Sequence, residues 1–237
     1  MSEANAAQED VESTDDEYDE EFDWDDGKQE IVAGEAGEEF DAQEVLPRLF
    51  LGSVYAATNE ATMKAHGVTH VLVVSGVLPR LFPQSFRYCQ VDIDDFEMDN
   101  VLEVLPACFA FIDAALAEPD HCILVHCQGG VSRSVSVVTA YIMQLKKIPF
   151  DEALCIVKTV RMVYPNEGFR GQLADLHECI LATSPDIDWT DSKAFYESDG
   201  YKECMERKAI RDKDFAKSCE KTPLFEAFKE IAKSAHS

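Results

Sequence analysis

One short segment combines a cysteine, two glycines and an arginine in an order that can bind and attack a phosphate group. A loop with two glycines can direct successive backbone N–H groups at one point, and a following helix adds its positive end there. Cys127 starts the loop and Arg133 ends it, which places a sulfur beneath a bound anion and a bidentate donor beside it. The cationic surroundings favour a nucleophilic thiolate. The segment is Val125-His126-Cys127-Gln128-Gly129-Gly130-Val131-Ser132-Arg133-Ser134.

The Cys-x5-Arg spacing alone is weak evidence, because eight cysteines and eight arginines give about 0.3 matches by chance. A second match runs from Cys155 to Arg161, but it has no glycine and follows a helical pattern, so its amides should be committed to the helix. Adding His126, Gly130 and Ser134 lowers the chance expectation of the first match to on the order of 10⁻⁵. Its predicted phosphate-binding residues are Gln128, Gly129, Gly130, Val131, Ser132 and Arg133.

The elements around this loop predict an α/β domain over residues 45–183. The apolar run Cys122–His126 is typical of a buried strand, and a helix is predicted from Ser134 to Lys147. Short apolar runs predict further strands, and amphipathic stretches predict further helices. The predicted strands are 45–52, 68–75 and 86–93, and the predicted helices are 53–66, 101–116, 151–161 and 168–182.

Two segments flank the domain. Residues 1–44 hold 19 acidic side chains and one base, Lys28, which predicts a disordered tail that is either a solvated spacer or a docking segment for a basic partner. Residues 184–237 form a C-terminal extension that we expect to be partly helical. A helix from Pro223 would carry one apolar face, which packs on the domain or binds a partner; the face consists of Leu224, Phe225, Phe228 and Ile231.

Composition argues against several classes of function. A net charge of −25 disfavours nucleic acid and membrane surfaces as partners. The longest apolar runs are near seven residues, whereas a membrane span needs about 20. Six scattered histidines suggest no metal site. Eight irregularly spaced cysteines and no leader pattern favour a reducing compartment, so we expect the cytoplasm, with the nucleus as a second location.

The segment His126–Ser134 resembles the HCxxGxSRS signature of the dual-specificity phosphatases, which belong to the cysteine-dependent protein tyrosine phosphatases. Residues 140–143 (AYIM) are similar to the family's AYLM, and 165–169 (PNEGF) with Gln172-Leu173 to its PNxGFxxQL. The resemblance covers roughly residues 45–183. It implies an α/β fold in a single domain, with a central mixed, largely parallel sheet flanked by helices.

The resemblance also implies roles for single residues, and it implies no cofactor. Cys127 would attack phosphorus and form a phosphocysteine, and Arg133 would bind the equatorial oxygens. Ser134 would hydrogen-bond the sulfur and ease its departure. His126 would orient the loop and tune the thiolate, or be a core histidine bonded to backbone. Cys89 and Cys122 would be either resolving thiols for an oxidised Cys127 or ordinary core cysteines.

A general acid is required because serine, threonine and tyrosine oxyanions leave poorly unless they are protonated. Spacing alone does not choose among the acidic side chains between 92 and 99, which are Asp92, Asp94, Asp95, Glu97 and Asp99. The family pattern implies Asp95, with Asp92 and Asp94 as the alternatives.

The expected activity is therefore hydrolysis of phosphotyrosine and phosphoserine or phosphothreonine in a phosphoprotein. A MAP kinase is one candidate substrate, although the chain lacks the basic docking cluster of MAP-kinase phosphatases. A phospho-residue binding module without turnover is the main alternative. An RNA triphosphatase or an arsenate reductase would also use such a loop, but an RNA enzyme should have a basic surface.

Overall fold

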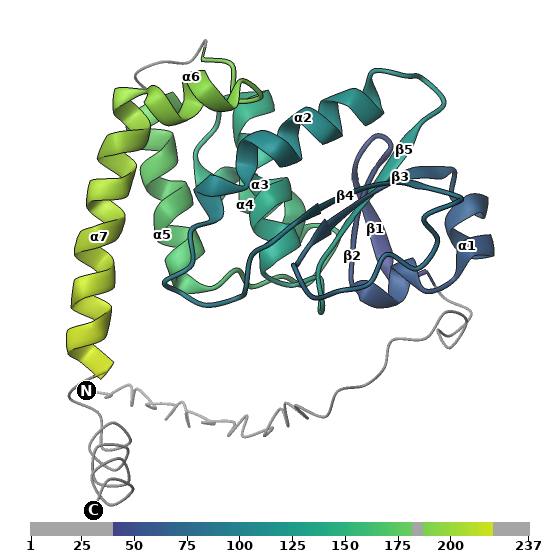
Figure 1. Ribbon diagram of the computed structural model, residues 1–237, viewed down its shortest axis with the longest axis horizontal. Helices are drawn as coiled ribbons and strands as arrows, with labels where there is room; N and C mark the ends of the chain where they lie inside the picture. Colours follow the sequence, from purple (N-terminus) through teal and green to yellow (C-terminus); the bar gives the residue numbers. More distant parts are fainter. Residues whose placement is uncertain (1–39, 182–186, 220–237) are drawn as a thin grey trace, which may run out of the picture. The chain divides into compact units, whose positions relative to one another are not determined.

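A five-stranded sheet forms the centre of the protein. The computed structural model describes residues 40–181 and 187–219. The strand order is β1-β2-β5-β3-β4, in which β1 is antiparallel to β2 and the other pairs are parallel (Figure 1). The expected mixed, largely parallel sheet is thus confirmed. The strands are β1 (Ala42–Leu46), β2 (Leu49–Gly52), β3 (Val68–Val74), β4 (Arg87–Val91) and β5 (Cys122–His126).

Helices follow most strands and continue after the last one. Figure 1 shows α1 beyond one end of the sheet and α7 beside α5 at the other. None of the helices in the described residues is long and apolar enough to cross a bilayer. The helical elements are η1 (Val54–Ala57), α1 (Glu60–Ala65), η2 (Val101–Glu103), α2 (Leu105–Leu116), α3 (Arg133–Lys146), α4 (Phe150–Lys158), α5 (Glu167–Leu176), η3 (His177–Leu181), α6 (Ser192–Glu197) and α7 (Asp199–Cys219).

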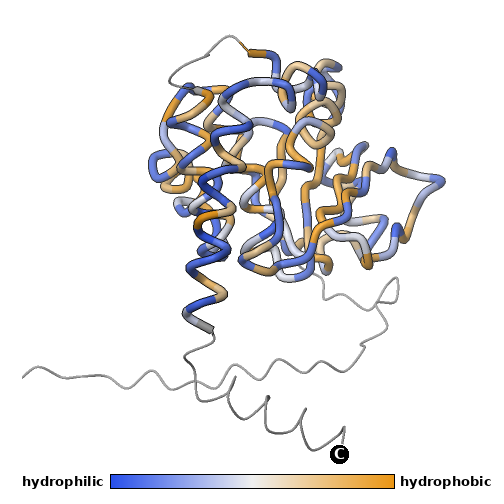
Figure 2. The backbone as a smooth tube through the Cα atoms, turned by 60° about the vertical axis from the view of Figure 1, so that its left-hand side comes forward, coloured by the Kyte–Doolittle hydropathy of each residue, from blue (hydrophilic) through white to orange (hydrophobic). Residues whose placement is uncertain are grey.

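The sheet is buried on both faces, because alternate side chains of its central strands enter two different cores. Leu72 of β3 and Val125 of β5 belong to the larger core, under α2 to α5. Val71 and Leu124 belong to the smaller core, under η1 and α1. Figure 2 shows the hydrophobic orange segments gathered inside the domain, whereas α7 alternates between blue and orange. Burial on both faces fixes the position of the carboxyl end of β5, where the loop that starts at Cys127 begins.

The start of the domain differs from the prediction. The predicted single strand 45–52 is wrong, because Pro47 and Arg48 form a turn between β1 and β2. Arg48 has a φ of 66°, and its guanidinium donates to the carbonyl oxygens of Leu116, Glu118 and His121. Strand β1 begins at Ala42, three residues before the predicted start of the domain at residue 45.

The predicted helix 53–66 is two elements. Ser53 caps η1 and Asn59 caps α1, each with its side-chain oxygen. Asn and Ser in such positions favour a new helix start over helix continuation.

The C-terminal extension contributes to the larger core. Trp189 and Phe195 are fully buried, and the Trp189 ring stacks on Phe109 at 5.7 Å between centroids. The extension is helical, as expected, but its described helices are α6 and α7, which the sequence did not predict. The predicted helix from Pro223 lies outside the described residues.

Candidate active site

The loop from Cys127 to Arg133, which we call the catalytic loop, connects β5 to α3 and forms the floor of the candidate site. Cys127 is 1% exposed, and α3 begins at Arg133, so the amino end of a 14-residue helix adjoins the loop. The Val54 N–H donates to Gln128 O at 3.0 Å, and the Tyr164 N–H donates to Val131 O at 2.9 Å. The loop is therefore held by hydrogen bonds from two sides, one from η1 and one from the segment between α4 and α5.

Gly130 fits where no other residue would. Its φ is +66°, and a Cβ built there would lie 2.5 Å from Gly52 O and 2.7 Å from Ser53 N. The loop therefore packs directly on the backbone at the end of β2, and this close approach requires glycine.

Ser134 lies against the candidate nucleophile. Its hydroxyl, fully buried in the first turn of α3, donates a hydrogen bond of 3.2 Å to Cys127 Sγ. A donor at that distance stabilises negative charge on sulfur more than it stabilises a neutral thiol. The structure thus brings together the two residues between which the family resemblance implies this contact.

Arg133 connects the loop to the acidic loop, residues 92–100, between β4 and η2. Its side chain is 12% exposed, its Nη1 donates to Ile93 O at 3.4 Å, and its Nε lies 3.7 Å from Asp95 Oδ2. Arg133 Nε is buried and has no hydrogen-bond partner in the described residues. A donor held at the loop without a protein acceptor is available to an anionic ligand.

Asp95 is the acidic residue that contacts the catalytic loop. Its Oδ1 accepts hydrogen bonds from Ser132 Oγ at 2.6 Å and from Asn166 Nδ2 at 2.8 Å. Its side chain is 33% exposed, so the carboxyl group remains open to solvent and substrate. Asp99 instead accepts a hydrogen bond from the Phe96 N–H within its own loop. The backbone of Glu97 packs against Gly168. Asp92 and Asp94 are exposed.

His126 is a buried neutral imidazole. Its Nδ1 donates to Cys127 O at 3.2 Å, and burial lowers its pKa to about 4. Its Nε2 is buried without a partner in the described residues. Both sequence interpretations of His126 are compatible with this geometry, since it is a core histidine bonded to the backbone of the nucleophile.

Arg161 is a site residue that the sequence analysis missed. The sequence pattern predicts a helix through Arg161, but α4 ends at Lys158, and Arg161 turns back to the catalytic loop. Its Nε donates to Gly130 O at 2.9 Å and its Nη2 to Gly129 O at 3.2 Å. Its Nη1 donates to Asp41 at 2.8 Å. No local sequence signal marks this role, because the contacts join residues between 31 and 120 positions apart.

The cysteines of the neighbouring strands lie away from Cys127. Cys122 is at the opposite end of β5, and a strand rises about 3.3 Å per residue. Burial raises the pKa of the Cys89 thiol and of the Cys122 thiol, and both are partly buried. These features are typical of core cysteines.

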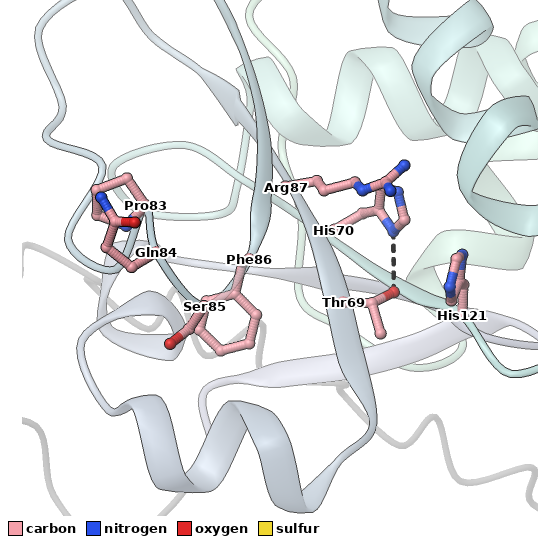
Figure 3. Close-up of a pocket in the computed structure, with 8 residues that line it drawn as sticks. All are labelled: Thr69, His70, Pro83, Gln84, Ser85, Phe86, Arg87 and His121. Atoms are coloured by element: carbon pink, nitrogen blue, oxygen red, sulfur yellow. Dashed lines mark hydrogen bonds between the residues drawn. The ribbon is translucent and has the colours of Figure 1, made fainter.

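A separate pocket lies at the amino ends of β3 and β4, at the other end of the sheet from the carboxyl end of β5. It has a volume of about 340 Å³, and Figure 3 shows His70, Arg87 and His121 on one side of it. The rings of His70 and His121 lie 5.0 Å apart. Burial, His121 and Arg87 lower the pKa of His70. These residues take no part in the candidate site.

Comparison with known proteins matches the chain from β2 into η3 and leaves β1, α6 and α7 outside the family model. A family model described as "Dual specificity phosphatase, catalytic domain" matches residues 49–179. The human "Dual specificity protein phosphatase 6" is 37% identical over 146 residues, which is 60% of this chain and 38% of that protein. The "MAP kinase phosphatase with leucine-rich repeats protein 1" of Dictyostelium discoideum is 36% identical over 130 residues, or 54% of this chain and 15% of that protein.

A solved human structure has the same fold. It is the "tyrosine phosphatase-like serine/threonine/tyrosine-interacting protein", with a TM-score of 0.52 and 33% identity over 57% of this chain and 94% of that one. The chain thus spans less than half the length of both curated relatives, and the shared part is the α/β domain that carries the candidate site.

Proposed function

Because this chain belongs to the dual specificity phosphatase family, we propose that it hydrolyses phosphate monoesters on protein side chains through a phosphocysteine on Cys127. In the first step the Cys127 thiolate forms a bond to phosphorus while the P–O bond to the side chain breaks. Asp95 gives its proton to the leaving oxygen. In the second step water attacks phosphorus, Asp95 takes a proton from that water, and the S–P bond breaks to restore the thiolate.

The observation that carries the proposal is the convergence of three groups on one loop. Ser134 Oγ lies 3.2 Å from Cys127 Sγ, and Ser132 Oγ holds Asp95 at 2.6 Å. The same α3 amino end presents Arg133 Nε without a hydrogen-bond partner in the described residues. A nucleophile, an oxyanion donor and a proton donor around one point are what phosphoryl transfer to sulfur requires.

The rim of the site supports a protein phospho-residue as substrate. Val131 of the catalytic loop, Phe96 beside Asp95, and Tyr164, whose amide binds Val131 O, are all exposed. Exposed aromatic and apolar side chains suit the ring of phosphotyrosine and the apolar atoms of a peptide. We include phosphoserine and phosphothreonine from the family description, and a MAP kinase as one candidate substrate from the name of the Dictyostelium relative.

A second candidate is a phospho-residue binding module. The similarity to a human protein named for its interactions supports it. The present chain, however, carries the cysteine, the arginine and the aspartate that turnover needs. Turnover of para-nitrophenyl phosphate by the wild type and its loss in Cys127→Ser, with binding of a phosphopeptide retained, would support the enzyme. Equal binding by both proteins with no turnover by the wild type would support the module instead. A chelator should leave the activity unchanged.

The acidic segment before the domain has a proposed role as an electrostatic docking segment. Nineteen acidic residues within positions 1–44 would attract a substrate with basic residues around its phosphorylation site. Removal of residues 1–39 should raise KM for such a peptide at low salt and leave it unchanged at high salt. A KM that is unaffected at both salt concentrations would indicate a spacer.

The cellular location is proposed from the cysteines. Six cysteines of the described residues have free thiols, which supports a reducing compartment such as the cytoplasm, with the nucleus as a second location; they are Cys89, Cys108, Cys122, Cys127, Cys155 and Cys204. Imaging of a fluorescent fusion tests this location.

A further inference from the structure

The helix α7 lies outside the region that matches the family, and it docks along α5. Gly200 at its start allows close approach, because a Cβ there would lie 2.4 Å from Cys179 O. Further along, Asp175 of α5 pairs with both Arg207 and Arg211 of α7. Figure 1 shows the two helices side by side. These contacts place the middle of α7 next to the acidic loop.

Lys208 of α7 reaches the backbone of this loop at Met98. It is 6% exposed, and its Nζ donates to Met98 O and, at 2.7 Å, to Asp212 Oδ2. A buried ammonium group is costly unless it is paired and hydrogen-bonded, and an apolar side chain usually packs as well or better in such a place. The docking of α7 alone therefore does not account for a lysine here, whereas the carbonyl oxygen of the acidic loop does.

The same stretch of the loop has two more anchors. Gln172 of α5 is 1% exposed; its Oε1 accepts from Val101 N–H at 3.0 Å and its Nε2 donates to Asp99 O at 2.7 Å. Asn100 Nδ2 donates to Met205 Sδ on α7 at 3.3 Å. Residues 98–101 are thus held from α5 and α7.

Asp95 stands on the other half of this loop, three residues before Met98, and its carboxyl group is held by the catalytic loop. The two halves are linked, since Asp99 Oδ2 accepts from Phe96 N–H at 3.4 Å. A shift of Met98 would be passed to Phe96 and then to Asp95. Proton transfer requires the carboxyl group within hydrogen-bond reach of the leaving oxygen, so a shift on the order of 1 Å would slow the reaction.

We propose that Lys208 on α7 is a positioning residue that holds the acidic loop so that Asp95 stays beside Arg133 in the protonating position. The proposal rests on the proposed function, in which Asp95 is the general acid. It gives the C-terminal extension a part in the chemistry, although none of the described residues of the extension belongs to the candidate site.

The test compares two substrates that differ in their need for a general acid, phenyl phosphate and para-nitrophenyl phosphate. Nitrophenolate leaves without much help, whereas phenolate needs a proton. We expect Lys208→Met, which keeps the apolar stem and removes the donor, to lower kcat/KM about tenfold for phenyl phosphate and less than about threefold for para-nitrophenyl phosphate. The control is Lys202→Met, an exposed lysine of α7 that pairs with Asp199, and it should change neither value.

A double mutant separates positioning from general loss of structure. In an Asp95→Asn background, Lys208→Met should cause no more than about a twofold further loss, because the acid it positions is gone. Equal losses for both substrates, or a full further loss in the Asp95→Asn background, would overturn the proposal while leaving the phosphatase itself intact. Absence of wild-type turnover would overturn the proposed function as well.

Two more variants keep the test decisive if Lys208→Met folds poorly. Lys208→Arg retains a donor and should recover most of the phenyl phosphate activity. Met205→Leu keeps the volume and removes the sulfur acceptor of Asn100, and it should lower phenyl phosphate turnover in the same direction but by a smaller factor. Wild-type selectivity between the two substrates in Met205→Leu, together with no recovery in Lys208→Arg, would also refute the positioning role.

Discussion

The Ser132 hydroxyl donates a hydrogen bond of 2.6 Å to Oδ1 of Asp95 and accepts one of 3.1 Å from the Asn166 N–H. One side chain of the catalytic loop thereby joins the acidic loop and the amino end of α5. Asn166 also caps α5 through its own side chain, which accepts from Phe169 N–H. Because three segments meet at Ser132, the position of Asp95 depends on the catalytic loop as well as on its own.

The first prediction concerns Asp95. Asp95→Asn should lower kcat for a phosphotyrosine peptide about 100-fold, since the amide cannot protonate the leaving oxygen. Formation of the phosphocysteine from para-nitrophenyl phosphate, measured as a burst in rapid mixing, should change much less. Asp94→Asn is the matched control, because Asp94 is exposed and forms no hydrogen bond or ion pair with the catalytic loop in the described residues, and it should retain wild-type kcat within about twofold. A large loss in Asp94→Asn would assign the acid to that residue.

The second prediction uses the protonation of His126. Burial lowers its pKa from 6.5 to about 4, so at intermediate pH the unfolded chain binds a proton there and the folded protein does not. This contribution to the free energy of unfolding is complete above pH 6.5 and is lost as pH falls towards 4. Its size is about 3 kcal/mol.

Urea unfolding at pH 7 and pH 4.5 checks this value. The stability of the wild type should fall more between these pH values than that of His126→Asn, which has no titrating ring. All other groups are common to both proteins and cancel in the comparison. Identical pH dependence in the two proteins would mean that folding does not lower the pKa of His126.

Much of the fold could be predicted from local patterns. Strand β5 has the predicted ends, because an uninterrupted apolar run is followed at once by the glycine pair. The turn between β1 and β2 was missed because it depends on Arg48, whose guanidinium binds carbonyl groups about 70 residues away. A residue in the left-handed conformation that is not glycine or asparagine gives no local signal.

The missed part of the site has the same cause. The loop pattern predicted Cys127 and Arg133 as site residues, and the family resemblance implied Asp95. Arg161 and Lys208 act on backbone carbonyl groups, at Gly130 and Met98, and carbonyl groups are present at every residue. A side chain whose partner is a carbonyl group leaves no complementary residue type to find in the sequence. Such contacts become visible only once the chain is folded.

The third prediction separates the two glycines of the catalytic loop. Gly130→Ala should destabilise the protein by roughly 1–2 kcal/mol from the left-handed backbone alone, with more from the contact with Gly52. It should also weaken binding of vanadate, because the loop must shift. Gly129→Ala is the control, since a Cβ there meets only Val131 Cγ2 at 3.5 Å. Thermal unfolding and vanadate titration of both variants test this prediction. Equal stability and equal vanadate affinity of Gly130→Ala and Gly129→Ala would contradict it.

The fourth prediction concerns where the catalytic unit begins. Asp41 accepts hydrogen bonds from Arg161 and from Ser53. Partial burial raises the pKa of Asp41, but these two partners together lower it by more, so that the pKa lies below its usual value. Ala42 pairs with Gly52 in the sheet. A chain that starts at residue 40 keeps these contacts, whereas one that starts at residue 45 loses them and leaves Arg161 without its carboxylate.

We therefore expect removal of residues 1–39 to leave the melting temperature and the turnover of para-nitrophenyl phosphate unchanged. Removal of residues 1–44 should lower both, because losing the charged hydrogen bonds between a nearly buried arginine and a partly exposed carboxylate costs roughly 1–3 kcal/mol, and the pairing of β1 is lost as well. Asp41→Asn in the chain that starts at residue 40 isolates the ion pair, and it should reproduce part of the loss. Equal behaviour of the two truncated proteins would show that Arg161 holds the catalytic loop without Asp41.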